Sequence, residues 1–263
     1  MEPTIDIIVV NYKTYPVLQT FLNSYSHFKP QTSSRIIIVD NESDKEQFDN
    51  ISKPENSICL ESDDNLGYAK ACNYGASIGD SKYIALMNSD VEFVNNTCID
   101  ICVEFLEDNP DVGIVGPFQY CEDRNNKKLV THAGIVGPGD KPVQRNWKSS
   151  SVNKYRTNEE VLMVIGAVMI IRREAWDAMR SDPTFKKHWP DAVGAMPEHK
   201  LYYEDTALCY AMPYFGYKVY YIGEAEIIHQ WHKTISKYGD GGYFHKSRES
   251  FRNLMDDWGI LHD

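Results

Sequence analysis

The sequence lacks any apolar run of the roughly 20 residues that a membrane-spanning helix needs, and its first residues form no basic and then apolar leader. It also lacks an excess of positive charge, because 27 Lys and Arg face 38 Asp and Glu, for a formal net charge of −11. Nonspecific binding to nucleic acid requires a basic face, so nucleic acid is not expected as a main partner. The expected location is the cytoplasm, free or peripheral at the inner face of the membrane.

The six cysteines form no CxxC pair. Without a leader they are expected to be reduced thiols rather than disulfides or zinc ligands. Hydrophobic residues make up 42% and charged residues 25% of the 263 residues, which is ordinary globular usage. We expect one domain over residues 1–263. The oligomeric state is left open.

In the first half, short β-rich runs alternate with helical stretches, which is typical of a parallel sheet with crossover helices. The pattern predicts strands over residues 5–10, 35–39, 57–60 and 83–87, and helices over 15–28, 68–78 and 97–107. The fold class is therefore α/β, with a mostly parallel central sheet flanked by helices. Ligands of such sheets bind beyond the carboxyl ends of the strands, where Asn11, Asp40 and Asp90 stand.

The second half is less regular. Residues 120–158 are polar and contain Gly and Pro, which predicts an acceptor-side insertion or mobile loop with a β-like run at 129–136. Gly166 interrupts the apolar run 161–171, which predicts two strands there. Further strands are predicted at 112–115, 218–222 and 225–228, and helices at 173–179, 203–215 and 243–258. Gly239, Gly241 and Gly242 predict a second mobile segment that orders over a bound donor.

Two carboxylates follow predicted strands directly. Asp90 could hold a hard divalent cation against a diphosphate, because Mg²⁺ takes one or two carboxylates together with phosphate oxygens. Asp40 could accept hydrogen bonds from a ribose or a base. An ordinary turn or helix cap is the alternative at both positions. Asn65 and Gly67 open a helix whose free backbone N–H groups favour an anion or a nucleotide contact.

Glu204 and Asp205 begin a predicted helix. One of them could be a general base that takes the proton of an acceptor hydroxyl, and simple charge at a helix start is the alternative. His229 follows a predicted strand and could bind a metal or a diphosphate, although an isolated histidine is more often neither. Trp231 could stack on a sugar ring, while a place in the core is the alternative.

In combination these signals resemble glycosyltransferase family two, which has the GT-A fold, and especially its rhamnosyltransferase-like members. Seven motifs follow in the order of the family, between residues 5 and 236. They are IIVVNY at 7–12, VDNES at 39–43, NLGYAKACNYG at 65–75, LMNSDV at 86–91, GAVMIIRR at 166–173, YEDTAL at 203–208, and Ile228 with His229.

The resemblance implies a nucleotide-sugar half over about 1–95 and an acceptor and catalytic half over about 96–263. It also implies a role for each matched position. Asp40 would contact the nucleoside, Asp90 a divalent Mn²⁺ or Mg²⁺, and His229 the metal or the diphosphate. Asp205 would be the base, with Glu204 in support. The nucleotide-sugar site would also include Asn11, Tyr12, Asn65, Gly67, Asn88 and Ser89, and the acceptor site Gly166, Ala167 and Trp231.

The implied reaction is inverting transfer from a UDP- or dTDP-linked sugar to a hydroxyl of a glycan, a lipid-linked glycan, a protein or a small molecule. Two positions depart from the family: Ala207 replaces the second aspartate of EDxDL, and residues 210–212 replace its arginine-bearing continuation. The QxxRW signature of processive synthases is absent, so single-sugar addition is expected.

Two other functions stay open. A sugar nucleotidyltransferase would carry a glycine-rich basic loop after the first strand, where this chain has Asn11, Tyr12 and Lys13. A binding protein that kept the fold without turnover is the non-enzyme alternative, and Ala207 keeps it open.

Overall fold

The computed structural model describes residues 2–55, 57–139, 141–145, 147–199, 202–230 and 243–260. Trp231 and the predicted mobile segment at Gly239 to Gly242 lie outside the described residues. The elements of the first half are β1 (Ile5–Asn11), α1 (Tyr15–His27), β2 (Ser34–Asn41), α2 (Lys45–Asp49), β3 (Ile58–Ser62), α3 (Tyr68–Ile78), β4 (Tyr83–Asn88), β5 (Val91–Glu92) and α4 (Cys98–Asp108).

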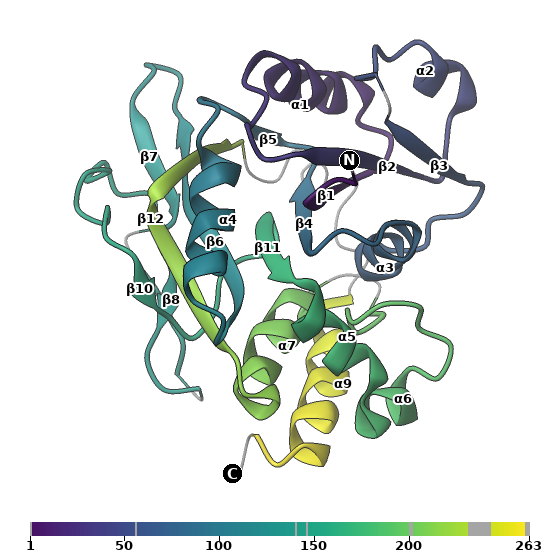
Figure 1. Cartoon of the computed structure of the whole chain (residues 1–263), viewed down its shortest axis with the longest axis vertical. Coiled ribbons are helices and arrows are strands. Elements are labelled where there is room, and N and C mark those ends of the chain that lie inside the picture. The colour runs from purple at the N-terminus through teal and green to yellow at the C-terminus, as the bar shows by residue number, and fades with distance from the viewer. Residues whose placement is uncertain are drawn as a thin grey trace.

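The second half adds further strands and a group of helices (Figure 1). Its strands are β6 (Val112–Glu122), β7 (Lys128–His132), β8 (Ile135–Val136), β9 (Val143–Gln144), β10 (Glu159–Glu160), β11 (Val168–Arg172) and β12 (Lys218–His229). Its helices are α5 (Arg173–Ser181), α6 (Pro183–His188), α7 (Glu204–Ala211), the 3-10 turn η1 (Met212–Phe215) and α9 (Tyr243–Asp257).

The central sheet has the order β10-β12-β6-β11-β4-β1-β2-β3, with β5 paired to β12 and β7 to β6. Strands β3, β2, β1 and β4 are parallel, whereas β11 runs antiparallel between β4 and β6. All seven residues of β1 are buried, as expected for a parallel strand covered on both faces. The predicted α/β class with a mostly parallel sheet is confirmed.

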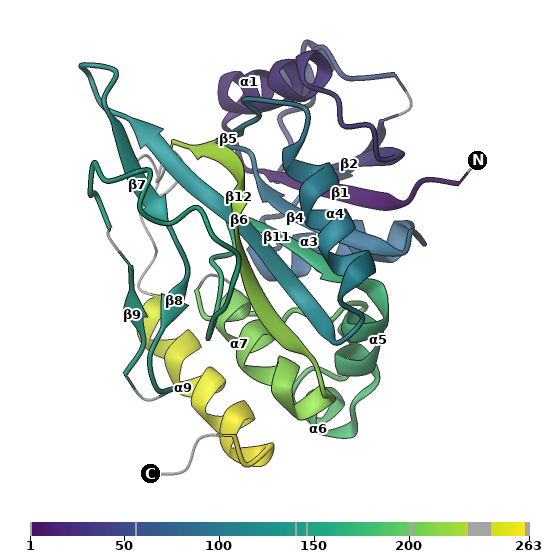
Figure 2. The same cartoon turned by 60° about the vertical axis from the view of Figure 1, so that its left-hand side comes forward.

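Helices cover both faces of this sheet, which makes three layers (Figures 1 and 2). Apolar side chains of α1, α2 and α4 form the core on one face, and those of α3, α5, α6, α7 and α9 form the core on the other. The strand β1 serves both, because Ile7 and Val9 point to the first core and Ile8 and Val10 to the second.

Three strand predictions for the second half need correction. The runs 218–222 and 225–228 are one strand, β12, with a register shift between Ile222 and Glu226. The run 161–171 holds only the strand β11, because Gly166 and Ala167 form a turn before it. Within 120–158 the β-like run predicted at 129–136 is confirmed by β7 and β8. The predicted strand 112–115 is longer than expected, because β6 continues to Glu122 and pairs with β7, where Tyr120 and Val130 pack together across the strands into the core.

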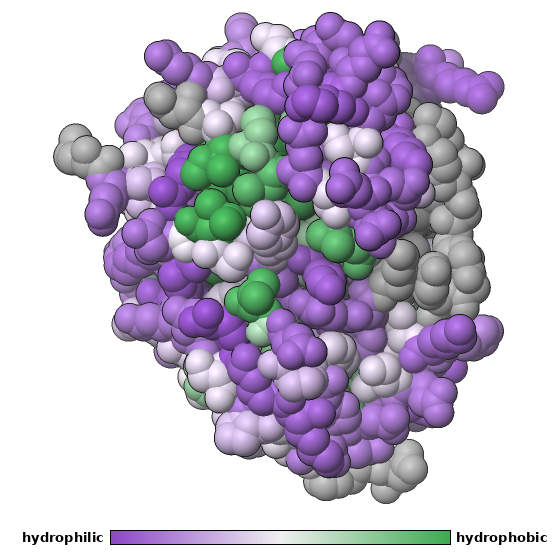
Figure 3. Space-filling view, turned by 90° about the vertical axis from the view of Figure 1, so that its right-hand side faces the viewer, coloured by the Kyte–Doolittle hydropathy of each residue, from purple (hydrophilic) through white to green (hydrophobic). Residues whose placement is uncertain are grey.

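The face of β3 and α3 is partly apolar. Figure 3 shows apolar side chains gathered within a mostly hydrophilic surface, on the side that is at the right of Figure 1. Ile58 and Leu60 of the end strand β3 are half-buried, and Ile78 of α3 is exposed. Ile58 and Leu60 pack against the core that α3 shares, at the end strand of the sheet.

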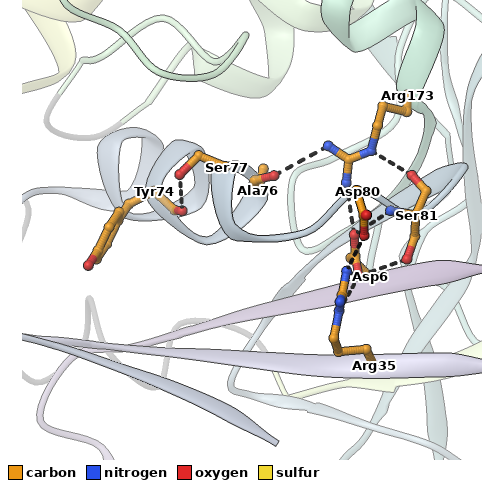
Figure 4. A network of polar contacts seen from close by, with 8 residues as sticks. All are labelled: Asp6, Arg35, Tyr74, Ala76, Ser77, Asp80, Ser81 and Arg173. Carbon is orange, nitrogen blue, oxygen red and sulfur yellow. Dashed lines mark hydrogen bonds and ion pairs between the residues drawn. The ribbon is translucent and has the colours of Figure 1, made fainter. Parts of the chain in front are cut away.

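A buried carboxylate connects the amino ends of β1 and β2 to neighbouring segments, at the opposite edge of the sheet from the predicted site (Figure 4). Asp6 of β1 is fully buried and forms ion pairs with Arg35 of β2 and with Arg173 of α5, at 2.7 and 2.8 Å. The backbone N–H and the hydroxyl of Ser81 also donate to Asp6, at 3.0 and 2.8 Å. Asp6 thereby joins segments from both halves of the chain.

We expect Asp6→Ala to lower the free energy of unfolding by about 3 kcal/mol, because it leaves two arginines without their buried partner. Urea unfolding measures the change. Asp80→Ala is the matched control, because Asp80 binds the same Arg35 but its side chain is 75% exposed. Its removal should change the free energy of unfolding far less, because solvent screens the exposed pair. Equal costs for the two variants would contradict this role of Asp6.

Candidate functional site

Three predicted site residues meet at the carboxyl ends of adjacent parallel strands. Asn11 ends β1 and is in register with Asp40 of β2, and Val10 is in register with Asn88 at the end of β4. Asn11 donates from Nδ2 to Asp40 Oδ1 at 2.7 Å and accepts from the backbone N–H and hydroxyl of Thr14 at 3.3 and 3.0 Å. The pair therefore fixes the start of α1 against the edge of the sheet.

The carboxylate of Asp40 is fully buried. Besides Asn11, it accepts from the hydroxyls of Tyr15 at 3.1 Å and Ser43 at 2.5 Å. Burial raises the pKa of Tyr15 to about 12, so this hydroxyl stays a hydrogen-bond donor. Three donors thus hold the Asp40 side chain in place, so Asp40 helps to fix the loops after β1 and β2. Its contact with a nucleoside stays a prediction.

The segment before α3 is bound to the end of β2. Asn41 donates to Asn65 Oδ1 at 3.2 Å and accepts from the backbone N–H of Leu66 at 2.7 Å. Asn65 also accepts from the N–H of Gly67 at 2.9 Å. Gly67 has a φ of +83° at the N-cap of α3, a conformation that favours glycine. Tyr12 and Lys13 directly follow β1 and are half-buried. Lys13 forms an ion pair with Glu42, which directly follows β2.

Asp90 and His229 come together from distant parts of the chain. Strand β12 pairs with β5 so that His229 is in register with Val91, next to Asp90. His229 Nε2 lies 3.5 Å from Asp90 Oδ1, and both residues are more than 90% buried. Ser89, also buried, lies 3.5 Å from the hydroxyl of Thr14. The predicted metal ligands are therefore neighbours.

A divalent cation fits this pair. An octahedral ion places adjacent ligands about 3 Å apart when each is about 2.1 Å from it, and Mg²⁺ uses one or two protein ligands with phosphates and water. No group of three or more His, Cys, Asp or Glu side chains suited to a metal occurs within the described ranges. Asp90 and His229 would thus supply the protein's share of the ligands, with the remaining ones from a diphosphate.

Glu204 and Asp205 begin α7 after two tyrosines in the left-handed conformation, with φ of 71° at Tyr202 and 69° at Tyr203. Such conformations are costly for non-glycine residues and cluster at functional sites. Both carboxyl groups line a cavity of about 880 Å³. The strained turn aims the start of α7 at this cavity.

The two carboxyl groups have different surroundings. Asp205 accepts from the N–H of Gly166 at 2.8 Å, and from the N–H and hydroxyl of Thr206 at 2.7 and 3.3 Å. Burial raises its pKa, and these donors oppose the rise. Glu204 Oε2 is buried and has no hydrogen-bond partner among the residues that the structure describes. Burial, and next the charge of Asp205, raise the pKa of Glu204 to about 8. Near neutral pH Glu204 therefore holds a proton, and the hydrogen bonds that Asp205 accepts favour its own charged form.

Gly166 and Ala167 connect the two groups of residues. The carbonyl of Ala167 accepts from the N–H of Asn88 at 3.0 Å, and the carbonyl of Gly166 accepts from the hydroxyl of Tyr68 at 2.9 Å. A Cβ on Gly166 would lie 3.1 Å from Cβ of Asp205, so only glycine gives this close approach freely. The turn thus joins the end of β4 to the start of α7.

The sequence did not single out several residues that the structure brings to the site. Tyr68 links α3 to Gly166, and Tyr202 turns the chain before α7. Gln119 and His132 face each other across β6 and β7, fully buried and with side-chain polar atoms that have no partner among the described residues. Burial, and next the nearby His229, lower the pKa of His132 to about 3, so His132 is neutral near pH 7. For Gln119 and His132, a polar residue within a β-rich run is the only signal in the sequence.

Comparison with known proteins gives the family. The model of glycosyl transferase family 2 matches residues 6–179. The chain belongs to this family. It is 24% identical over 251 residues to the O-antigen chain rhamnosyltransferase WbaN of Salmonella anatum, covering 92% of this chain and 72% of that protein. The predicted membership and enzyme class are confirmed, and a nucleotide sugar is the donor that the family implies.

Two solved structures share the fold of this family 2 chain. One is the mannosyltransferase PcManGT from Pyrobaculum calidifontis in complex with GDP-Man and Mn²⁺, with a TM-score of 0.60, 14% identity and coverage of 100% of this chain and 66% of that chain. The other is GalNAc-T7 with UDP, GalNAc and Mn²⁺, with a TM-score of 0.65, 13% identity and coverage of 98% and 50%. The chain thus spans between half and two thirds of these proteins.

Two further observations concern the Ala207 position and membrane-spanning helices. Ala207, which stands where the family has a second aspartate, is fully buried in the core, so a carboxylate would be costly there. In the part of the chain that the structure describes, no helix is long and apolar enough to cross a membrane.

Proposed function

We propose that this family 2 glycosyltransferase is an inverting, metal-dependent and non-processive enzyme that transfers a sugar from a UDP- or dTDP-linked donor to an acceptor hydroxyl. The observation that carries the proposal is the pair Glu204 and Asp205, whose surroundings separate their protonation states beside a cavity. Pairs of carboxyl groups with separated pKa values mark acid and base roles.

Asp205 is the general base in this proposal. Each of its two oxygens offers about two acceptor positions. The N–H and the hydroxyl of Thr206 use both positions of Oδ1, and the N–H of Gly166 uses one position of Oδ2. The second position of Oδ2 is left for the acceptor hydroxyl. The acceptor hydroxyl gives its proton to that position while its oxygen forms a bond to the anomeric carbon. The bond between this carbon and the diphosphate oxygen breaks, and the diphosphate leaves with the electron pair. One base completes an inverting displacement.

The donor lies at the carboxyl ends of β1, β2 and β4. We assign the nucleotide to Asn11, Tyr12, Asp40, Asn65, Gly67, Asn88 and Ser89. Asp90 and His229 would hold Mn²⁺ or Mg²⁺, which supplies positive charge to offset the charge that grows on the leaving diphosphate. Both solved relatives contain Mn²⁺, which supports this choice. Gly166 and Ala167 border the acceptor.

A panel of nucleotide sugars with Mn²⁺, Mg²⁺ or chelator tests the proposal through release of the nucleoside diphosphate. UDP or dTDP released only with metal is the expected result. Binding of nucleotide sugar without release in any combination would favour the binding protein, and release of pyrophosphate from a nucleoside triphosphate and a sugar phosphate would favour the nucleotidyltransferase.

The proton on Glu204 gives a pH dependence. Above a pH of about 8, Glu204 ionises beside Asp205, and we expect activity to fall because a second charge is then buried next to the base. Glu204→Gln, which stays neutral, should keep activity at pH 7 within about threefold and lose this alkaline decline. The pH profile of kcat measures both. Inactivity of Glu204→Gln at pH 7 would make Glu204 the base instead.

A further inference from the structure

The cavity beside the two carboxyl groups has a wall formed by α9. The cavity lies between the β8–β9 hairpin and α9, which are close neighbours in Figure 2, and residues of both line it. The same cavity is lined by Glu204 and Asp205 at the start of α7, so a ligand on this wall would lie beside the proposed base.

Aromatic rings form part of the wall. Phe244 of α9 packs on Tyr202 and Tyr203, with ring centroids 5.7 and 5.4 Å away. Tyr203 in turn stacks on Phe251 at 5.3 Å. Phe251 is buried, whereas Phe244 is 43% exposed and lines the cavity. A single exposed apolar residue is ordinary, but this ring rests on the two residues whose strained backbone also aims Glu204 and Asp205.

The rest of this wall is polar and of mixed charge. Arg248 and Arg252 line it from α9, one helical turn apart, together with Glu249 and Asp256. Glu204 is protonated near neutral pH, so the acidic side chains of Asp205, Glu249 and Asp256 face the two arginines and leave an acidic excess of one. An anionic ligand would meet this acidic excess, and a purely apolar ligand would leave the charged groups without partners. A neutral molecule with many hydroxyls satisfies both signs, because each hydroxyl donates and accepts.

The volume of the cavity indicates the size of the ligand that it can hold. At about 880 Å³, the cavity is near the upper end of the ~300–1,000 Å³ common for small-molecule sites. One hydroxyl-bearing side chain would leave most of it unfilled. An apolar ring face beside mixed polar groups in a space of this size matches a sugar of more than one unit, whose C–H face packs on an aromatic ring while its hydroxyls reach the rim.

We propose that the acceptor is a neutral oligosaccharide, and that Phe244 and Tyr202 form the surface on which one of its rings packs, with Arg248 and Glu249 binding its hydroxyls. This inference rests on the proposed function, because it names the acceptor of the same site. The binding energy of that ring, away from the reacting hydroxyl, holds the hydroxyl at Asp205.

Saturation-transfer NMR with methyl glycosides and with neutral di- and trisaccharides tests the proposal on the full chain. We expect at least one oligosaccharide to bind more tightly than the methyl glycosides. Phe244→Ala should raise its Kd at least tenfold, and Phe244→Trp should retain binding. Tyr74→Ala is the matched control, because Tyr74 is an aromatic residue of similar exposure, 37%, on α3 and outside the cavity wall.

The affinity for UDP and dTDP, measured on the same variants, separates the two proposals. Retained nucleotide binding with a lost oligosaccharide supports the acceptor surface. Oligosaccharide binding that Phe244→Ala leaves unchanged overturns it. Serine and threonine peptides and sugar phosphates are added to the NMR panel, and binding of these alone, with no oligosaccharide bound, overturns it as well. Failure of the proposed function would instead appear as no nucleotide-sugar cleavage in the wild-type chain.

Discussion

Asp205→Asn is expected to lower kcat by about 10² or more while the affinity for the donor stays nearly unchanged. The asparagine keeps the size of the side chain but cannot take the proton of the acceptor hydroxyl. Single-turnover kinetics measure the loss, and calorimetry with the donor measures its binding. Two backbone N–H groups hold the carboxylate of Asp205 in position, that of Gly166 at 2.8 Å and that of Thr206 at 2.7 Å.

The amide also changes this hydrogen bonding. Gly166 and Thr206 donate to different oxygens of Asp205, and an asparagine has only one oxygen, so one of these bonds is lost at about 0.5–1.5 kcal/mol. A thermal unfolding curve therefore accompanies the kinetics. Normal turnover by Asp205→Asn, together with an inactive Glu204→Gln, would exchange the roles of the two residues.

Asp90→Ala is expected to reduce activity with Mn²⁺ or Mg²⁺ to the level that the wild-type enzyme shows with chelator. In the proposed mechanism Asp90, which follows β4, and His229, which ends β12, hold the metal, and their side chains lie 3.5 Å apart. Removal of Asp90 would leave the diphosphate charge poorly offset. Electron paramagnetic resonance of Mn²⁺ measures the lost binding independently of turnover.

The matched control for this variant is Asp111→Ala, because Asp111 is an exposed aspartate at the other end of the sheet that pairs with Lys218. It should bind Mn²⁺ and turn over as the wild type does. Full activity of Asp90→Ala in the presence of chelator would remove the metal from the mechanism.

The first half of the fold was predictable because its signals are local. The strands β1, β2 and β4 are short apolar runs, and a run of this kind is buried on both faces of a parallel sheet wherever its neighbours lie. The polar residues Asn11, Asp40 and Asn88 follow them directly, so their meeting at one edge required only that the strands be parallel and adjacent.

The second half was predicted less well. The turn at Gly166 and the register shift in β12 depend on partners that are distant in the sequence. A glycine in an apolar run signals a break but not its form. The pairing of β6 with β7 likewise needed the tertiary core that Tyr120 and Val130 share.

The α/β class, the family motifs and the chemical types of the site residues could be predicted from the sequence alone, since each follows from local periodicity or a short motif. The folded chain was needed to show that His229 lies beside Asp90, that the pKa of Glu204 is raised to about 8, and that Phe244 lines the cavity beside Glu204 and Asp205. A pKa depends on burial and on neighbouring charges, and a cavity wall depends on how helices pack, so both follow from contacts between residues that the sequence keeps far apart.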